Sequence, residues 1–213
     1  MSEYNELTLA GFVAREARRT PEAPAGSVDG AVGREPRTYG LLWDKGRRLA
    51  AGLSKLGIVA GDRIALMLAG ELELADAMVA CSVIGAVFVS LDPRVDATEL
   101  AHTLQACGCK GVIAPDYALL PVAVVRERIY TLRWVVGICT EQGRSTPAQL
   151  QARGVRPYAE VAAADASART FAGSNPDDAM QLVFPGAAEH SLPDIVTHRQ
   201  HFETTMAMPT SSD

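Results

Sequence analysis

The chain has 213 residues, of which 48% are hydrophobic and 21% charged, and its formal net charge is −5. This composition excludes intrinsic disorder for most of the chain, because disordered segments combine low hydrophobicity with high net charge. Twenty lysines and arginines are outnumbered by twenty-five acidic residues, so the chain lacks the positive charge that generic nucleic-acid binding requires. The length is compatible with one large domain.

The N-terminal segment, residues 1–6, is polar and acidic and has neither the basic start nor the apolar stretch of a signal peptide. The longest uncharged run, residues 77–91, is shorter than the roughly 20 residues that a membrane helix needs. We therefore expect a cytoplasmic protein with no membrane partner.

The cysteines predict a structural rather than a metal or redox role. Cys81 and Cys139 lie inside apolar runs, where a free cysteine behaves as a small hydrophobic residue. Cys107 and Cys109 are the only close pair, and they lack the two-residue spacer and the second pair of a zinc knuckle. We expect reduced cysteines and no metal.

The first predicted elements are two helices. Residues 7–18 show the apolar spacing of an amphipathic helix, which ends before Thr20 and Pro21. Residues 24–33 are rich in Gly and Ala and predict a short strand and a turn. Thr38 is a suitable N-cap for a second helix, and Gly57 follows where a left-handed C-terminal cap belongs.

Apolar strands and helices then alternate. Residues 63–68, 86–91, 111–114 and 134–139 are compact apolar runs typical of buried strands. Two helical segments separate the first three of these strands, residues 71–84 and residues 97–107, the latter capped by Asp96. This order predicts an α/β fold: a mostly parallel, doubly wound sheet with helices on both faces.

The last third of the chain is less regular. Residues 140–176 predict an irregular excursion with short helical or strand pieces. Residues 180–184 are again apolar, residues 194–197 predict a last strand, and residues 198–208 predict a helix. We expect one domain over residues 1–208 and a disordered tail over residues 209–213.

The order of several motifs resembles the start of the adenylate-forming ligases, which include acyl-CoA and aryl-CoA synthetases, luciferases and peptide-synthetase adenylation domains. The motifs that carry the resemblance are residues 38–43, 48–53, 56–58, 61–66, 80–94 and 99–104. The resemblance covers essentially the whole chain but only the first part of the family's large domain. It implies the fold of the first ligase subdomain, and it places the family's later catalytic motifs beyond Asp213.

The family's first core motif is a hydroxyl- and glycine-rich phosphate loop that ends Pro-Lys-Gly and is followed by a strand and a Thr-His pair. The resemblance places that pair at Thr197 and His198. The corresponding loop positions are Pro185, Gly186, Ala187, Ala188, Glu189, His190, Ser191, Leu192, Pro193 and Asp194.

This loop departs from the family pattern in the residues that would bind phosphate. A triphosphate loop works because small residues let backbone N–H groups approach phosphate oxygens while hydroxyls and a lysine add donors and charge. Here there is one glycine, one hydroxyl at Ser191 and no lysine, and the lysine position falls on Leu192, Pro193 or Asp194. Glu189 and Asp194 would repel a polyphosphate. We therefore predict no catalytic residue and no bound cofactor in this chain.

Other candidate sites have weaker patterns. His190, His198 and His201, with Glu189 and Asp194, do not match a known metal-ligand spacing. Ser191 beside His190 lacks the Gly-x-Ser-x-Gly elbow of a hydrolase. The glycines at 26, 30 and 33 have the wrong spacing for a dinucleotide fingerprint.

The function that the resemblance implies is that of a stand-alone, catalytically incomplete ligase-like protein. It would act by binding, as a partner or regulator of a biosynthetic enzyme or as a binder of a small acyl or aryl ligand. The alternative is one half of a split adenylate-forming ligase, with ATP and magnesium as cofactors, completed by a second polypeptide. A decayed gene product is a third interpretation. An apolar face left uncovered by the missing subdomain predicts a homodimer or a hetero-partner.

Overall fold

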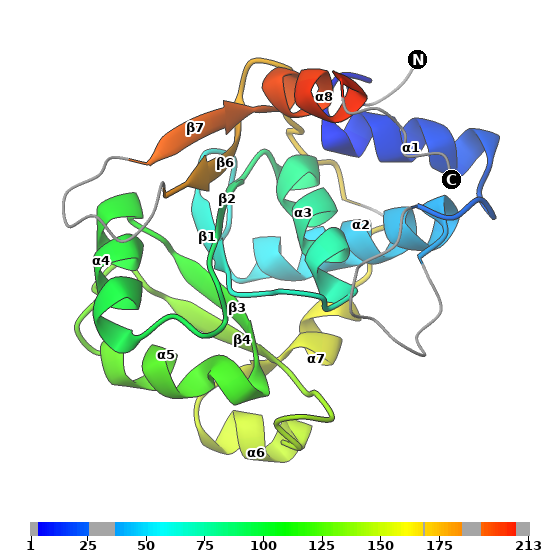
Figure 1. Ribbon diagram of the computed structural model, residues 1–213. Helices are drawn as coiled ribbons and strands as arrows, with labels where there is room; N and C mark the ends of the chain where they lie inside the picture. The colour runs from blue at the N-terminus through cyan, green and yellow to red at the C-terminus, as the bar shows by residue number, and fades with distance from the viewer. Residues whose placement is uncertain (1–3, 26–36, 168, 185–192, 208–213) are drawn as a thin grey trace, which may run out of the picture.

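The computed structural model describes residues 4–25, 37–167, 169–184 and 193–207 (Figure 1). The strands are β1 (Arg63–Leu66), β2 (Val87–Ser90), β3 (Gly111–Pro115), β4 (Trp134–Ile138), β5 (Arg156–Pro157), β6 (Ala179–Val183) and β7 (Asp194–Thr197). The helices are α1 (Leu9–Arg19), α2 (Tyr39–Lys55), α3 (Glu73–Ile84), α4 (Ala97–Cys107), the short 3₁₀ helix η1 (Asp116–Ala118), α5 (Leu119–Val125), α6 (Pro147–Ala152), α7 (Tyr158–Ala162) and α8 (His198–Ala207).

The seven strands form one sheet in the order β5-β4-β3-β1-β2-β6-β7. The first six pair in parallel, and β7 pairs antiparallel with β6 at one end of the sheet. The chain moves from β1 outward to β2, then crosses β1 to reach β3 and β4. This is the predicted doubly wound α/β fold, with a reversal of direction at β1 and β3.

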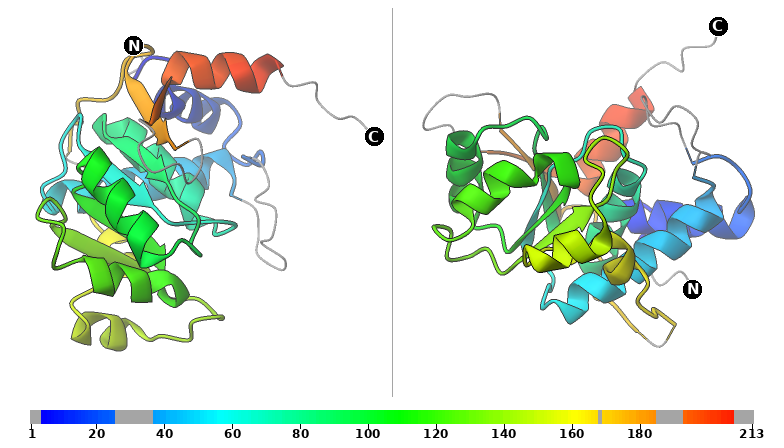
Figure 2. Two further views of the ribbon diagram at one scale, coloured as in Figure 1. Left: turned by 60° about the vertical axis from the view of Figure 1, so that its left-hand side comes forward. Right: turned by 90° about the horizontal axis from the view of Figure 1, so that it is seen from below.

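Successive strand residues point to opposite faces and build two apolar clusters. Ile64 and Leu66 of β1 pack in the cluster that includes residues of α1, α2, α3 and α7. Ala65 and Met67 pack in the other cluster, with residues of α4 and α5. Figure 2 shows these two groups of helices on opposite sides of the sheet. Burial on both faces explains why the strands are continuous apolar runs rather than alternating ones.

Local signals set the helix ends as the sequence predicts. The Thr38 hydroxyl accepts from the Leu41 N–H at the start of α2, and Gly57 follows the helix with φ 89°. The Asp96 carboxylate accepts from two N–H groups at the start of α4. Side-chain oxygens at these positions satisfy N–H groups that have no partner within the helix.

Two glycines allow close packing of neighbouring elements. A Cβ on Gly52 of α2 would lie 2.0 Å from the backbone oxygen of Val161 in α7. A Cβ on Gly111 of β3 would lie 2.2 Å from the ring of Trp134, which packs across the strand pair. Small residues are therefore required at both contacts, whatever their helix or strand propensity.

One charged pair is buried on the α2–α3 side of the sheet. The Arg37 guanidinium donates twice to the Asp76 carboxylate, with Nε–Oδ1 3.1 Å and Nη2–Oδ2 2.8 Å. The Asp76 side chain is fully buried, and the Tyr158 hydroxyl lies 3.5 Å from its Oδ2. The pair ties the segment before α2 to α3.

Three features differ from the sequence-based expectations or extend them. The helix α5 was not predicted, because it is short and carries Pro121, which its first turn tolerates. Residues 140–176 hold α6, β5 and α7, and α7 places Tyr158 and Val161 in the core. Cys139 is exposed just after β4, so the expectation of a buried residue was wrong, whereas Cys81, Cys107 and Cys109 are buried and free.

Some expectations fall partly or wholly outside the described residues. In the predicted 24–33 strand and turn, Pro24 forms an isolated antiparallel bridge with Thr38, and residues 26–36 lie outside the described chain. The expected tail, residues 209–213, also lies outside it. Within the described part of the chain, no helix has the length and apolar character needed to cross a bilayer.

Candidate functional site

The predicted phosphate-loop positions lie between β6 and β7. Pro185, Gly186, Ala187, Ala188, Glu189, His190, Ser191 and Leu192 are outside the described residues. Pro193 is half-buried, and Asp194 is exposed at the start of β7, paired in the antiparallel ladder with Val183. The two strands therefore bring the two ends of the loop together, and an exposed carboxylate lies at one of those ends.

Contacts between β6 and neighbouring elements hold this end of the sheet. Gln181 Nε2 donates to Ser90 Oγ of β2 over 3.0 Å. The Phe184 ring packs edge-on against His102 of α4, with 6.4 Å between the ring centroids. Sequence analysis missed Gln181, Ser90 and His102 because their contacts depend on strand register and on helix placement, which no local pattern reveals.

Thr197 begins α8 as a helix cap. Its hydroxyl accepts from the Gln200 N–H over 3.2 Å, and its own N–H donates to Gln200 Oε1 over 2.9 Å. This reciprocal pair is a capping box, which satisfies two backbone N–H groups at a helix start. The local sequence thus places the Thr-His pair at the strand-to-helix turn, as the family resemblance implied.

His198, the next residue, is fully buried and joins α8 to α1. The ring Nδ1 of His198 accepts from the Leu9 N–H over 3.4 Å, and the backbone N–H of His198 donates to the Asp178 carbonyl over 3.3 Å. Figure 2 shows α8 beside α1, and the rings of Phe12 and Phe202 lie 5.7 Å apart between these helices. Burial lowers the pKa of His198 to about 4, so the imidazole is neutral at neutral pH.

The histidine-based metal hypothesis involves residues that lie only partly in the described structure. Asp194 is exposed and His198 buried, while Glu189 and His190 lie outside the described residues. Among the described residues, no group of three or more His, Cys, Asp or Glu side chains is placed to hold a metal ion. The Ser191–His190 hypothesis and the glycines at 26, 30 and 33 also lie outside the described chain.

A second group of polar residues lies at the carboxyl ends of β1 and β3, where the sheet reverses direction. The Tyr117 hydroxyl donates to Glu71 Oε1 over 2.8 Å, and Glu71 Oε2 accepts from the Ala69 N–H over 2.6 Å. Burial and this carboxylate raise the pKa of Tyr117 to about 12. Carboxyl ends at such a reversal are the usual ligand position of doubly wound folds.

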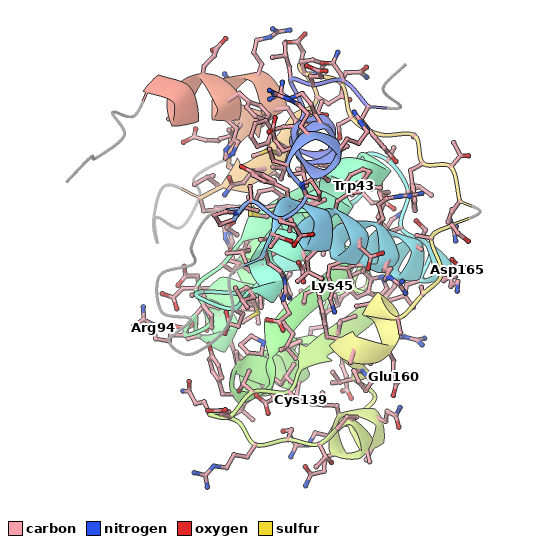
Figure 3. The ribbon with its side chains drawn as sticks, turned by 90° about the vertical axis from the view of Figure 1, so that its right-hand side faces the viewer. Trp43, Lys45, Arg94, Cys139, Glu160 and Asp165 are labelled. Carbon is pink, nitrogen blue, oxygen red and sulfur yellow. The ribbon has the colours of Figure 1, made fainter. Side chains whose placement is uncertain are left out.

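Two further carboxylates belong to this edge of the sheet. Burial alone would raise the pKa of Asp116, but hydrogen bonds from Thr140 and Ser145 lower it. Asp92 has a pKa lowered to about 2 by its hydrogen bonds with Arg94. Figure 3 shows Arg94 projecting from the molecule into open space. Sequence analysis missed this edge because its residues come from separate loops.

A comparison with known protein families identifies the chain. The family model described as AMP-binding enzyme matches residues 13–184, which extends from α1 to the end of β6. The chain belongs to this AMP-binding enzyme family. The match ends directly before the segment whose composition departs from the phosphate-loop pattern.

Similar proteins are larger than this chain. Feruloyl-CoA synthase of Amycolatopsis sp is 33% identical over 122 residues, which cover 57% of this chain and 24% of that enzyme. The 4-coumarate–CoA ligase 5 of Oryza sativa subsp. japonica is 36% identical over 86 residues, which cover 40% of this chain and 16% of the ligase. The matched part is thus about a quarter or less of the length of these relatives.

Solved structures of adenylate-forming ligases share the fold. Acetoacetyl-CoA synthetase from Streptomyces lividans superposes with a TM-score of 0.74 at 23% identity, over 90% of this chain and 30% of that protein. MbtA of Mycobacterium smegmatis superposes with a TM-score of 0.73 at 23% identity, over 93% of this chain and 35% of that protein. At this level of identity the likeness concerns the fold, and it confirms the predicted ligase-like α/β architecture.

Proposed function

We propose that this AMP-binding family chain acts by binding, as a partner or regulatory protein, and does not adenylate a substrate by itself. The observation that carries the proposal is the composition of the β6–β7 connection. It contains one glycine, one hydroxyl and no lysine, and it adds Glu189 and Asp194. Such a segment supplies few of the N–H groups and none of the positive charge that hold a triphosphate.

The donor set does not fit ATP with magnesium. Asp194 is exposed at the start of β7, opposite the last residue of β6 in the ladder. A carboxylate at this place repels a polyphosphate, and the segment offers no cation to offset the repulsion. We therefore derive no reaction step through ATP.

The names of the relatives support a ligand class. Their names refer to feruloyl and 4-coumarate groups, so we propose a small aryl or acyl carboxylate as the ligand of this chain. Ferulate and 4-coumarate are the first probes to use. Binding of these acids without nucleotide binding is the expected behaviour.

The test is a calorimetric titration of the 213-residue chain with Mg-ATP, with AMP and with each acid. We expect no nucleotide binding in the micromolar range. A matched gain-of-function variant, Glu189→Gly with Leu192→Lys, restores a glycine and a lysine to the segment, and we expect it to bind ATP more tightly. Clear micromolar ATP binding by the wild-type chain would refute the proposal.

The alternative is one half of a split ligase, which a second polypeptide would complete. The observation in its favour is that the frame around the loop is well formed: the β6–β7 pairing, the Thr197 cap and the buried His198. This alternative requires nucleotide binding by the wild-type segment, so the same titration separates the two functions.

For the partner, we propose a second copy of this chain or another protein bound on the outer face of α5. Leu120 and Val124 lie one helical turn apart and are 77% and 51% exposed, and Tyr130, in the loop that follows α5, is 84% exposed. Exposed apolar side chains that gather on one face mark interaction surfaces. Light scattering over micromolar concentrations should report a dimer, and Leu120→Glu should dissociate it. A monomeric mass throughout would refute the homodimer.

A further inference from the structure

A groove of about 770 Å³ lies between α5, the start of β4 and the segment that follows α6, and we call it the α5 groove. Its apolar lining comes from Leu119, Leu120, Val122 and Ala123 of α5, Leu132 and Val135 at β4, and Val155 before β5. Leu120 and Ala123 are exposed, whereas the other five are buried beneath them and leave little apolar surface of their own. This volume is in the range of pockets that hold small molecules. Figure 1 shows α5 and α6 on the same side of the molecule. In the sheet, β4 is separated from β6 by three strands, so the groove is distinct from the β6–β7 segment.

Three arginines line the groove together with this apolar surface: Arg126, Arg133 and Arg153. Among the described residues, none of them forms an ion pair with a carboxylate. Arg126 Nη1 donates to the Gly154 carbonyl over 2.9 Å, which holds its guanidinium beside the segment after α6. Arg133 and Arg153 are exposed. Unpaired guanidinium groups bind carboxylates and phosphates through two parallel hydrogen bonds.

Two carboxylates also line the groove, and they offset two of its three positive charges. The Asp116 oxygens accept from the Thr140 hydroxyl, the Thr140 N–H and the Ser145 N–H, over 2.6 to 3.2 Å. Glu127 is exposed. The lining therefore carries a net charge of +1 in a chain whose formal net charge is −5.

A smaller hollow adjoins the groove and extends it toward the edge of the sheet. Its volume is about 310 Å³, and it shares Arg126, Arg133, Val135 and Val155 with the α5 groove. It adds Arg156 and Glu160 to the charged lining. The arginines thus continue along β4 to β5.

We propose that the α5 groove binds a small amphiphilic anion. The apolar body of the ligand would lie against Leu120 and Ala123, the exposed apolar residues of the lining, and its carboxylate or phosphate head would contact Arg133 and Arg153. An apolar floor alone would accept neutral and cationic amphiphiles equally well, whereas the arginines select an anionic head. This site does not depend on the proposed function of the β6–β7 segment.

The test is a calorimetric titration of the full chain with decanoate, decyl phosphate, decyltrimethylammonium and decanol, all below their critical micelle concentrations. Inorganic phosphate alone is the control for binding of the head without the chain. We expect saturable binding of both decyl anions and binding at least about tenfold weaker for the cation and the alcohol. Comparison of decanoate with decyl phosphate identifies the preferred head.

Two variants separate the contacts with the ligand's head group from the contacts with its apolar chain. Arg133→Gln with Arg153→Gln should weaken the binding of the decyl anions about tenfold or more and leave the binding of decanol unchanged. Ala123→Trp, at an exposed position that lines the groove, should weaken the binding of every decyl compound. The matched control is Arg19→Gln with Arg169→Gln, which removes the same charge at exposed positions outside the groove.

Three results would overturn the proposal. They are equal affinity for the anionic and cationic decyl compounds, an equal loss in the groove variant and the control variant, and no binding by the wild-type chain. Light scattering of the same samples identifies another occupant. If Ala123→Trp converts a dimer to a monomer while the decyl anions do not bind, the groove is an interface between copies of the chain.

Discussion

The burial of His198 predicts that part of this protein's stability is lost in mildly acidic solution. The pKa of this histidine is about 4 in the folded chain, against 6.5 for an ordinary histidine. The unfolded chain therefore binds a proton between these two values while the folded chain does not. Stability is complete above pH 6.5 and decreases as the pH falls toward 4.

The size of the effect follows from the shift. One pKa unit corresponds to about 1.4 kcal/mol, so acidification from pH 8 to pH 5 should cost about 2 kcal/mol of unfolding free energy through His198 alone. Carboxylates begin to titrate at the lower end of this range. For this reason the useful quantity is the difference between the wild type and a variant that lacks this imidazole.

The assay is urea unfolding of the wild type and of His198→Gln at pH 8 and pH 5. The glutamine can still accept from the Leu9 N–H, so the contact between α8 and α1 has a substitute. We expect the wild type to lose about 2 kcal/mol more than the variant between the two pH values. His102→Gln, at an exposed position, is the control and should lose as much as the wild type.

An NMR titration provides an independent value. The His198 ring protons should titrate near pH 4 in the folded protein. The reasoning fails if this histidine titrates near 6.5, or if the wild type and His198→Gln lose stability equally between pH 8 and pH 5. Either result would mean that the imidazole is accessible to water or has an acidic partner.

Three further predictions concern stability and ionisation. Asp76→Ala leaves the partly buried Arg37 guanidinium unpaired and should cost about 3 kcal/mol in urea unfolding, whereas Asp44→Ala in an exposed pair should cost at most about 1 kcal/mol; equal losses would contradict the buried pairing. Gly52→Ala should destabilise by about 1–3 kcal/mol despite the better helix propensity of alanine, and a higher melting temperature would show that the helices have room to separate. The phenol absorbance of Tyr117 should titrate near pH 12 and shift toward its ordinary value of 10 in Glu71→Gln. An unchanged titration in that variant would exclude the hydrogen bond to the carboxylate.

The β6–β7 segment and the α5 groove lie on different parts of the sheet, so their ligands are tested separately. The proposed partner surface shares Leu120 with the groove, so a partner and an amphiphilic anion would compete there. The proposal for the β6–β7 segment is that it does not bind nucleotide, and the measured affinity for ATP and AMP tests it. The proposal for the α5 groove is that it binds an amphiphilic anion, and the test is the difference in affinity between decyl compounds with anionic and cationic head groups. A chain that fails one test can still pass the other.

Much of the fold was predictable from sequence because its signals are local. Thr38, Asp96 and Gly57 mark helix ends through side-chain oxygens or positive φ, and these effects need no distant partner. The continuous apolar runs of β1 to β4 predict strands covered on both faces. The composition of the loop, with its carboxylates and without a lysine, is likewise visible in sequence alone.

Other features depended on which elements become neighbours. The α5 groove, the hydrogen bond between Tyr117 and Glu71, and the burial of His198 against α1 each join residues far apart in the chain. Cys139 shows the same limit, because its apolar flanks predict burial although the strand ends one residue earlier. The sequence by itself determined the family, the order of elements and the altered loop, since these depend on short stretches of residues. Only the tertiary structure decided where charge and apolar surface meet, because strand order and helix placement set those distances.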